Sequence, residues 1–553
     1  MKTLLLTFVI LILICSNSYT QWSTNPYENL QVAEHGGNIH IASDGNGGAI
    51  VTFNNFADVV NGYLQLINKY GYFKWNEPKV ILDGPGQRNY VQDIFYNADG
   101  TILIGYTSGY TYIDSNLTQY SFFDPYIQKI DTNGIRLWGE DGIKLNPYSS
   151  SQRVSMFLCN DDEDGLYAFW VISPNEYPEY DSLFIQHISK NGERLWGENG
   201  IFIDDSIFST LNSWIIEAEG GDIYIQYRKK NTEHYIRKYD PSGNLVWTLI
   251  NSLSFPMVIN DDQGGIVVNG VKVVSPRQLI INRISTVGEK LWGEEGIIVD
   301  SVGANYADAL MLLNSDSTVS VFWDTEWWPN DDLFLQLYTL EGTQIWNEHL
   351  KISETISPKV DDGIIQSDNN SNYIIWRERR DSAGVYAQKI DASGNKLLNE
   401  DVLLQVMTYG TGYDEFNEIT DGNAGAIIVW RTDPPWGGIY AQQISKYGNL
   451  GEVITTVIGE NNNIDAGSFY LAQNYPNPFN PLTIIKYDLP FASEVSVVIY
   501  DILGRKVKEL VNTKQQAGRY EIQFDATNFA SGVYIYQLIS EKYINSKKMI
   551  LLK

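Results

Sequence analysis

Short apolar strands separated by polar turns follow one another along most of the chain. Runs rich in β-branched and aromatic residues, such as AIVTF, ILIGY, LYAFW and AIIVW, each come after a turn rich in Asp, Asn and Gly. This combination is typical of β-hairpins. An alternating strand comes next, as in YLQLI, YIQKI and FIQHI, and a tight turn at a glycine leads into a fourth strand. The pattern predicts units of four antiparallel strands with almost no helix.

This four-stranded unit recurs eight times. The clearest copies are IQKIDTNGIRLWGEDGIKL at 127–145, IQHISKNGERLWGENGI at 185–201 and INRISTVGEKLWGEEGI at 281–297. The glycine that all copies share returns about every 54 residues, at Gly71, Gly134, Gly192, Gly243, Gly288, Gly342, Gly394 and Gly448. Self-similarity at this period predicts an all-β repeat fold, an eight-bladed β-propeller over residues 21–460. Seven blades plus an atypical terminal unit is the alternative.

Six of the units carry a tryptophan four residues after the shared glycine, and we interpret these six as structural. They are Trp75, Trp138, Trp196, Trp247, Trp292 and Trp346, whereas the seventh and eighth units have Leu398 and Glu452. The copy DPSGNLVW resembles the tryptophan-docking motif of quinoprotein-like eight-bladed propellers. The resemblance implies that each tryptophan packs between neighbouring blades. The quinone-binding residues of those enzymes are not visible in this sequence.

Two segments compete for the strand that would close the ring. The segment QWSTNPYENLQVAE at 21–34 resembles a fourth strand without a blade of its own, because Trp22 precedes a turn glycine at the spacing that Trp75 also shows. The segment GEVITTVIG at 451–459 is the alternative candidate for the same edge. The sequence leaves both alternatives open.

Loops between the second and third strands carry the candidate ligand-binding residues. The longest insertion, TSGYTYIDSNLTQYSFFDP at 107–125, belongs to this class. Large planar side chains stack on sugar rings and anchor protein contacts. All such loops should lie on one face, opposite the acidic hairpin turns. The candidates are Tyr110, Tyr112, Tyr177, Tyr180, Trp327, Trp328 and Trp436.

Composition narrows the function. The net charge of −28 argues against nucleic acid as a partner, because phosphates require a basic surface. The five histidines are scattered and no nucleophile or phosphate-loop motif occurs, so no catalytic residue and no metal ligand is assigned. The acidic turns raise calcium as an alternative cofactor. A hydrolase or lyase with carboxylates at the propeller centre is the alternative to a binding protein.

The first 20 residues predict a secretory signal peptide. Lys2 precedes an apolar run that is too short to span a membrane, and small polar residues follow before Gln21. No later stretch is long and apolar enough to suggest a transmembrane segment.

The composition changes at a polar linker, residues 461–469, and residues 470–553 predict a small antiparallel β-sandwich. Four motifs follow in order: NYPNPFNP at 474–481, YDILGR at 500–505, SGVY at 531–534 and KKMILLK at the end. Together they resemble the type A C-terminal sorting domain of type IX secretion cargo. The resemblance implies an Ig-like fold and recognition by the outer-membrane translocon. We therefore expect an exported binding protein, secreted or on the cell surface of a Gram-negative bacterium of the Bacteroidetes type, with a glycan or a surface protein as ligand.

Overall fold

The computed structural model describes residues 22–552 apart from 56–58, 85, 114–118, 146–152, 162, 174–180, 219, 230–232, 252, 255, 275, 302–308, 326–331, 356, 358, 369, 381–382, 407–415, 433–436, 452–469, 475–476, 490–492, 503–504, 516–517, 528 and 541–542. The predicted signal peptide therefore lies outside the described residues. The chain divides into two compact units, Met1–Val453 and Ile454–Lys553. The described part of the chain contains strands and no helix.

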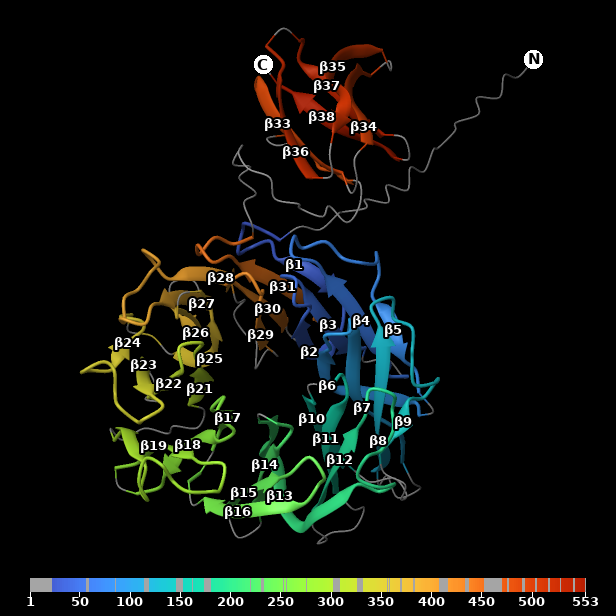
Figure 1. Ribbon diagram of the computed structural model, residues 1–553. Coiled ribbons are helices and arrows are strands. Elements are labelled where there is room, and N and C mark those ends of the chain that lie inside the picture. The colour runs from blue at the N-terminus through green and yellow to red at the C-terminus, as the bar shows by residue number, and fades with distance from the viewer. Residues whose placement is uncertain are drawn as a thin grey trace. The chain divides into compact units, whose positions relative to one another are not determined.

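Eight antiparallel blades follow one another around a ring in the first unit (Figure 1). This confirms the eight-bladed propeller, and the seven-bladed alternative is wrong. Blade 1 consists of β2 (Gly37–Ser43), β3 (Ala49–Asn54), β4 (Gly62–Ile67) and β5 (Lys79–Leu82), and blade 2 of β6 (Arg88–Tyr96), β7 (Thr101–Ile113), β8 (Gln119–Asp131) and β9 (Ile143–Lys144). Blade 3 consists of β10 (Arg153–Asn160), β11 (Leu166–Ser173), β12 (Asp181–Ile188) and the first part of β13 (Ile201–Glu217). Blade 4 consists of the rest of β13 with β14 (Ile223–Lys229), β15 (His234–Tyr239) and β16 (Leu245–Asn251). Blade 5 consists of β17 (Val258–Asn260), β18 (Ile266–Lys272), β19 (Gln278–Ile284) and β20 (Ile297–Asp300), and blade 6 of β21 (Leu310–Leu313), β22 (Thr318–Asp324), β23 (Leu333–Thr339) and β24 (Leu350–Lys351). Blade 7 consists of β25 (Lys359–Gln366), β26 (Asn372–Arg379), β27 (Ala383–Ile390) and β28 (Val402–Val406). Blade 8 consists of β29 (Phe416–Thr420), β30 (Ala426–Arg431), β31 (Ile439–Ile444) and β1 (Leu30–Ala33).

The second strand of each blade forms the centre of the core. Every residue of β3 is buried, and so are the first six residues of β11. Neighbouring blades cover both faces of such a strand, so its sequence is a continuous apolar run and does not alternate. Between blades 1 and 2, for example, Ile50 of β3 packs in one cluster with Ile104 of β7.

The N-terminal segment closes the ring. β1 pairs with β31 of the last blade, with Leu30 opposite Ala441. Upstream of it, the buried Trp22 donates its indole N–H to the carbonyl of Lys69 in blade 1, at 3.1 Å. Of the two segments that the sequence left in competition, this one occupies the edge. Residues 452–459 of the other lie outside the described residues.

The repeated tryptophans join each blade to the next. The ring of Trp196 lies against the shared glycine of the following blade, Gly243, where an added Cβ would approach the indole to 3.1 Å. For four of the six tryptophans, the acceptor of the indole N–H is a carbonyl two residues before the next shared glycine. The pairs are Trp196–Pro241, Trp247–Thr286, Trp292–Leu340 and Trp346–Ala392, at 2.9 to 3.1 Å. In blade 7, Leu398 takes this place and packs on Gly448.

The acidic turns also take part in contacts between neighbouring blades. One carboxylate oxygen of Asp261 accepts the N–H groups of its own turn, and the other accepts from Arg283 of the third strand at 2.8 Å. Arg283 then donates to the Leu340 carbonyl in the next blade, at 3.0 Å. Asp161 and His187 repeat the arrangement in blade 3, at 2.9 Å. Burial alone would raise the pKa of Asp161, but the hydrogen bonds from His187 and the turn lower it below its usual value.

The calcium alternative stays a prediction. Protein donors already bind these turn carboxylates, and no group of three or more His, Cys, Asp or Glu side chains suited to a metal ion occurs in the described ranges.

The second unit is a two-sheet β-sandwich, as the sequence predicts. One sheet has the order β32–β33–β36 and the other β35–β34–β37–β38. Their apolar side chains meet in one core that includes Tyr487, Val497 and Tyr536, all fully buried. The strands are β32 (Tyr470–Leu471), β33 (Leu482–Leu489), β34 (Ser493–Asp501), β35 (Lys506–Gln515), β36 (Gly518–Asp525), β37 (Gly532–Ser540) and β38 (Tyr543–Leu551).

Candidate functional site

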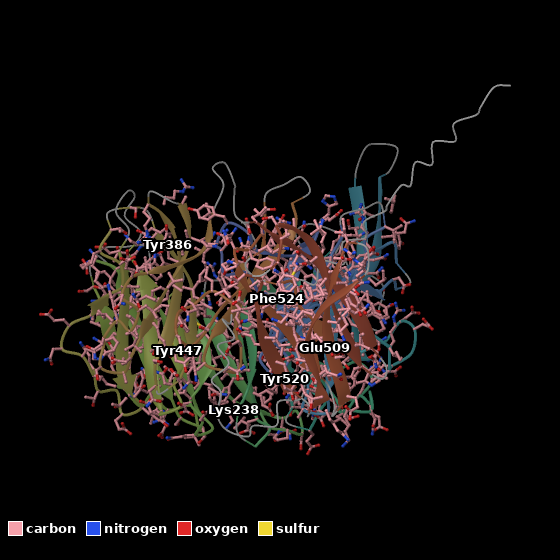
Figure 2. All side chains as sticks on the ribbon, turned by 90° about the horizontal axis from the view of Figure 1, so that it is seen from above. Lys238, Tyr386, Tyr447, Glu509, Tyr520 and Phe524 are labelled. Carbon is pink, nitrogen blue, oxygen red and sulfur yellow. The ribbon has the colours of Figure 1, made fainter. Side chains whose placement is uncertain are left out.

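A long hairpin stands where the sequence predicts a loop over 107–125. β7 and β8 are paired continuously from Thr101 opposite Asp131 to Ile113 opposite Gln119. The prediction of a loop is therefore wrong. Alternating Tyr, Thr, Ser and Phe side chains form cross-strand pairs along both strands, and these pairs favour a sheet over a loop. Figure 2 shows this hairpin extending beyond the edge of the ring. We call its outer part, 110–113 and 119–124, the arm.

Two glycines let the chain pack closely at the root of the arm. The link from blade 1 to blade 2 passes the arm at Gly86, where a Cβ would come within 2.3 Å of the backbone nitrogen of Gly109. A Cβ on Gly109 would in turn lie 1.9 Å from the Phe122 carbonyl oxygen. Ser108 completes the contact, because its hydroxyl accepts the Gly86 N–H at 3.0 Å. The arm is thus held at its base by the blade link.

One face of the arm carries a stack of aromatic rings, Tyr110, Phe122 and Tyr112, which we call the platform. The ring centroid of Phe122 lies 5.3 Å from that of Tyr110, with planes 26° apart, and 6.0 Å from that of Tyr112, with parallel planes. Tyr110 and Tyr112 are each 47% exposed. Tyr106 of β7 is on the same side of the strand as Tyr110 and Tyr112, and it packs against blade 1. The platform therefore continues the blade 1 side of the sheet out into solvent.

The two described candidates lie on the predicted face. Turns between strands one and two and between strands three and four share one edge of the ring, and Lys238, near that edge, lies away from the arm in Figure 2. Strand direction alternates, so the connection that carries Tyr110 and Tyr112 lies at the other edge. The remaining candidates Tyr177, Tyr180, Trp327, Trp328 and Trp436 lie outside the described residues, and their placement stays a prediction.

Near the ring centre, Asp93 of β6 is a carboxylate that sequence analysis did not single out. It is partly buried, accepts the backbone N–H of Leu158 in the next blade at 2.9 Å, and accepts that of Ile94 at 2.9 Å. Burial raises its pKa to about 7, although the two N–H donors act in the opposite direction. Its contacts join the inner strands of blades 2 and 3, which is a structural role.

We predict that Asp93 makes stability depend on pH. Its folded-state pKa lies above the usual 3.8, so the folded protein holds this proton more tightly than the unfolded chain. The stabilisation is complete below pH 4 and is lost as the pH rises through 7. Relative to Asp93→Asn, the parent should lose about 1.4 kcal/mol of unfolding free energy per pH unit across that window.

Urea unfolding of both proteins between pH 4 and 8 measures this difference. The comparison with Asp93→Asn is necessary because burial lowers the pKa of His40 and of His234 to about 4, which makes both proteins less stable as the pH falls. Parallel pH profiles for the parent and the variant would contradict the prediction.

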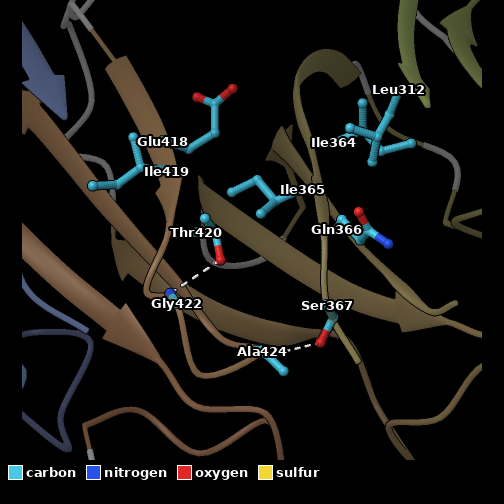
Figure 3. A pocket seen from close by; sticks show the side chains of 10 residues that line it. All are labelled: Leu312, Ile364, Ile365, Gln366, Ser367, Glu418, Ile419, Thr420, Gly422 and Ala424. Atoms are coloured by element: carbon cyan, nitrogen blue, oxygen red, sulfur yellow. Dashed lines mark hydrogen bonds between the residues drawn. The ribbon is translucent and has the colours of Figure 1, made fainter. Parts of the chain in front are cut away.

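A pocket of about 460 Å³ lies between the inner strands of blades 7 and 8 (Figure 3). Ile364 and Ile365 of β25 form one wall, and Glu418 and Thr420 of β29 form the other. Glu418 is the single ionisable residue among the described residues that line it. Hydrolysis by paired carboxylates needs an acid and a base, and one carboxylate does not supply both. This pocket therefore does not supply a carboxylate pair, and the hydrolase or lyase alternative stays a prediction.

In the second unit, the C-terminal motifs pack against one another. Asn477 accepts the Ile550 N–H at 2.8 Å, and Phe479 pairs with the last strand through two backbone hydrogen bonds of 2.9 Å. Met549 and Leu551 of that strand are fully buried. Arg505 donates to the Asp501 carboxylate at 2.6 Å and so closes the turn of the YDILGR motif. Motifs far apart in the sequence thus build one core and one terminal strand.

Residues 473–552 match the family described as the secretion system C-terminal sorting domain. The second unit is a type IX sorting domain. The sorting domain directs this protein through the type IX secretion system to the cell surface or the extracellular space, and it interacts with the machinery of that system. In the described ranges, no helix has the length and apolar character needed to cross a membrane.

Solved structures that resemble this chain share little sequence with it. A comparison with curated proteins gives no match. A eukaryotic initiation factor is 10% identical in sequence, with a TM-score of 0.40. The match covers 78% of this chain and 93% of that protein. Prolyl oligopeptidase B from Galerina marginata is 9% identical in sequence, with a TM-score of 0.40. The match covers 73% of this chain and 56% of that protein.

PorZ, a surface component of the type-IX secretion system of Porphyromonas gingivalis, shares 10% identity and a TM-score of 0.23, covering 93% of this chain and 75% of its own. These scores are too low to transfer an activity to this chain.

Proposed function

We propose that the propeller is an exported binding module and that the platform on the arm contacts its ligand. The observation that carries this proposal is the stack of Tyr110, Phe122 and Tyr112 on a hairpin that extends beyond the ring, with both tyrosines about half exposed. A folded protein gains no core stability by holding such rings in solvent. Exposed, pre-stacked aromatic side chains do supply large contact areas at low entropic cost.

The ligand class that suits this surface is a glycan or a protein on a neighbouring cell surface. Planar rings stack on the apolar faces of sugars, and they also anchor protein contacts. The protein is delivered to the surface or the medium, where both kinds of ligand are present. The predicted aromatic residues Trp327, Trp328 and Trp436 would extend the same face, and we include them in the proposed site.

The test is binding of the full mature chain to a glycan array and to an array of cell-surface proteins. Replacing Tyr110 and Tyr112 together by Ala should weaken the affinity for the ligand more than tenfold, because exposed aromatic anchors often contribute about 2 kcal/mol or more. Thermal stability should change little, since both side chains lie outside the core.

The matched control is Tyr447→Ala. Tyr447 is 73% exposed and adjoins the shared glycine of blade 8, at the opposite edge of the ring from the arm. This variant should bind as the parent does. A double variant that bound every array ligand with parental affinity would overturn the proposal.

A further inference from the structure

Blade 4 ends in an outer strand that differs from those of the other blades. β16 has seven residues, LVWTLIN, with no charged residue and no proline among them. It is the last strand of its sheet, at the rim of the ring (Figure 1), and among the described residues no strand pairs with its outer edge. Four of its seven residues are exposed, including Val246 at 50% and Ile250 at 53%. A long, uncharged and exposed edge is a template for another strand.

The outer strands of the other blades are protected. Those of blades 1, 2, 5 and 6 have two to four residues, and each contains a Lys or an Asp. The outer part of β13 in blade 3 contains Asp204 and Asp205. β28 of blade 7 is uncharged, but Gln405 is 5% exposed and Val406 donates its N–H to the Pro26 carbonyl at 3.4 Å. β1 of blade 8 has four residues. Short length, charge and coverage are the usual protections of an edge, and β16 has none of them.

The edge of β16 is self-complementary. A register shift against β15 separates Leu245 from Trp247, and the pairing is regular from Trp247 to Asn251. Two antiparallel copies of this regular part overlap fully about its midpoint, Leu249. Thr248 of one copy then lies opposite Ile250 of the partner subunit. Both residues are exposed, uncharged and β-branched. Such side chains favour strands and pair well across neighbouring strands.

We infer that two copies of this protein associate through β16, which pairs antiparallel with β16 of the second copy about a two-fold axis. A two-fold axis brings the same surface of both copies together, so an edge that matches itself suits it. Backbone hydrogen bonds join the two strands, and no like charges lie opposite each other within them. The contact lies on blade 4 and the arm on blade 2, so the inference goes beyond the proposed function and does not depend on it.

The net charge of −28 on each copy opposes this association, and it provides a test. Salt screens the repulsion between exposed charges, but it does not weaken pairing between uncharged strands. Raising NaCl from about 0.05 M to about 0.5 M should therefore lower the dissociation constant of the dimer at least about threefold. A dimer held by surface ion pairs would respond in the opposite direction.

Sedimentation equilibrium of the full mature chain measures the dimer, which we expect to be weak because a contact through one strand is small. Ile250→Lys should weaken the association at least about tenfold, because a charge on an exposed edge opposes strand pairing. The matched control is Ile298→Lys in β20, the outer strand of blade 5. Ile298 is 51% exposed, so the change in size, charge and exposure is the same, and association should stay within about threefold of the parent.

Cysteine crosslinking locates the contact. The one cysteine of the mature chain, Cys159, is buried, so new surface cysteines react without interference from it. A mixture of Thr248→Cys and Ile250→Cys copies should form a covalent dimer under mild oxidation, because directly opposite residues of two strands lie close enough for a disulfide. Ile298→Cys copies should form none.

A chain that stays monomeric at every concentration and salt would overturn the inference. A dimer that Ile250→Lys leaves intact would also overturn it, and so would a dimer in which the mixed cysteine variants fail to crosslink. Thermal unfolding checks that Ile250→Lys is folded, and the crosslinking test does not require that variant. Tyr110→Ala/Tyr112→Ala should associate as the parent does, so failure of this inference and failure of the proposed function are distinguishable.

Discussion

Deletion of residues 467–553 should leave a folded propeller in the periplasm and remove it from the cell surface and the medium. The sorting domain is the part of the chain that interacts with the type IX machinery, and a folded ring without it has no route through the outer membrane. Each unit has a hydrophobic core of its own among the described residues. The sandwich cluster contains residues from Leu471 to Leu551, and the described propeller clusters contain none of these. The truncated ring should therefore keep its fold.

Cell fractionation followed by limited proteolysis measures both parts of this expectation. The control is a fusion of residues 467–553 to a periplasmic reporter protein, which should become exported. Truncated propeller found in the medium in parental amounts would contradict the role of the sorting domain. A degraded propeller would contradict the independence of the two cores.

Replacing Trp196 by Ala should lower the unfolding free energy of the propeller by about 3–5 kcal/mol. Trp196 is 9% exposed, lies against Gly243 of the next blade and donates to the Pro241 carbonyl at 3.1 Å. Removing the ring leaves a cavity at a blade junction that the surrounding sheets cannot fill without moving. Trp138→Ala, in the preceding blade, should act in the same direction.

Urea and thermal unfolding measure this effect, and two variants separate its parts. Trp196→Phe keeps most of the apolar contact and loses the indole N–H. Its unfolding free energy should fall by about 1 kcal/mol for the lost hydrogen bond, plus part of the packing contribution. Leu195→Ala changes an adjacent side chain that is 49% exposed and should stay within about 0.5 kcal/mol of the parent. Parental stability of Trp196→Ala would show that this ring does not hold the blades together.

Local patterns in the sequence carry much of the fold. The alternation of apolar strands and Asp, Asn and Gly turns predicts the hairpins, and the recurrence of the shared glycine predicts the eight blades that the structure contains. The sorting domain is equally readable, because Asn477, Phe479 and the terminal strand are specific residues in a fixed order. Each of these signals is a pattern of residue types at a fixed spacing, so it is visible in the sequence alone.

The candidate site is less predictable. Tyr110 and Tyr112 are singled out by their residue type in a long insertion, but the same insertion is interpreted as a loop. Whether such a segment pairs depends on Phe122 and Ser121 lying directly opposite, and that depends on a register that starts at Thr101 inside the blade. Asp93 carries no sequence signal. Its environment depends on the Leu158 backbone of another blade, whose N–H it accepts.

The sequence by itself determined the units of this protein: the strands, their turns, the repeat, the tryptophan positions and the sorting motifs. Only the tertiary structure decided how the units combine. Both 21–34 and 451–459 have the pattern of a closing strand, and Leu30–Ala33 is the segment that pairs with β31. The two segments share one local pattern, so the choice is visible only in the pairing with β31. The physical reason is the same for the closing strand, the arm and Asp93, because each depends on contacts between residues that are distant in sequence and leave no local pattern.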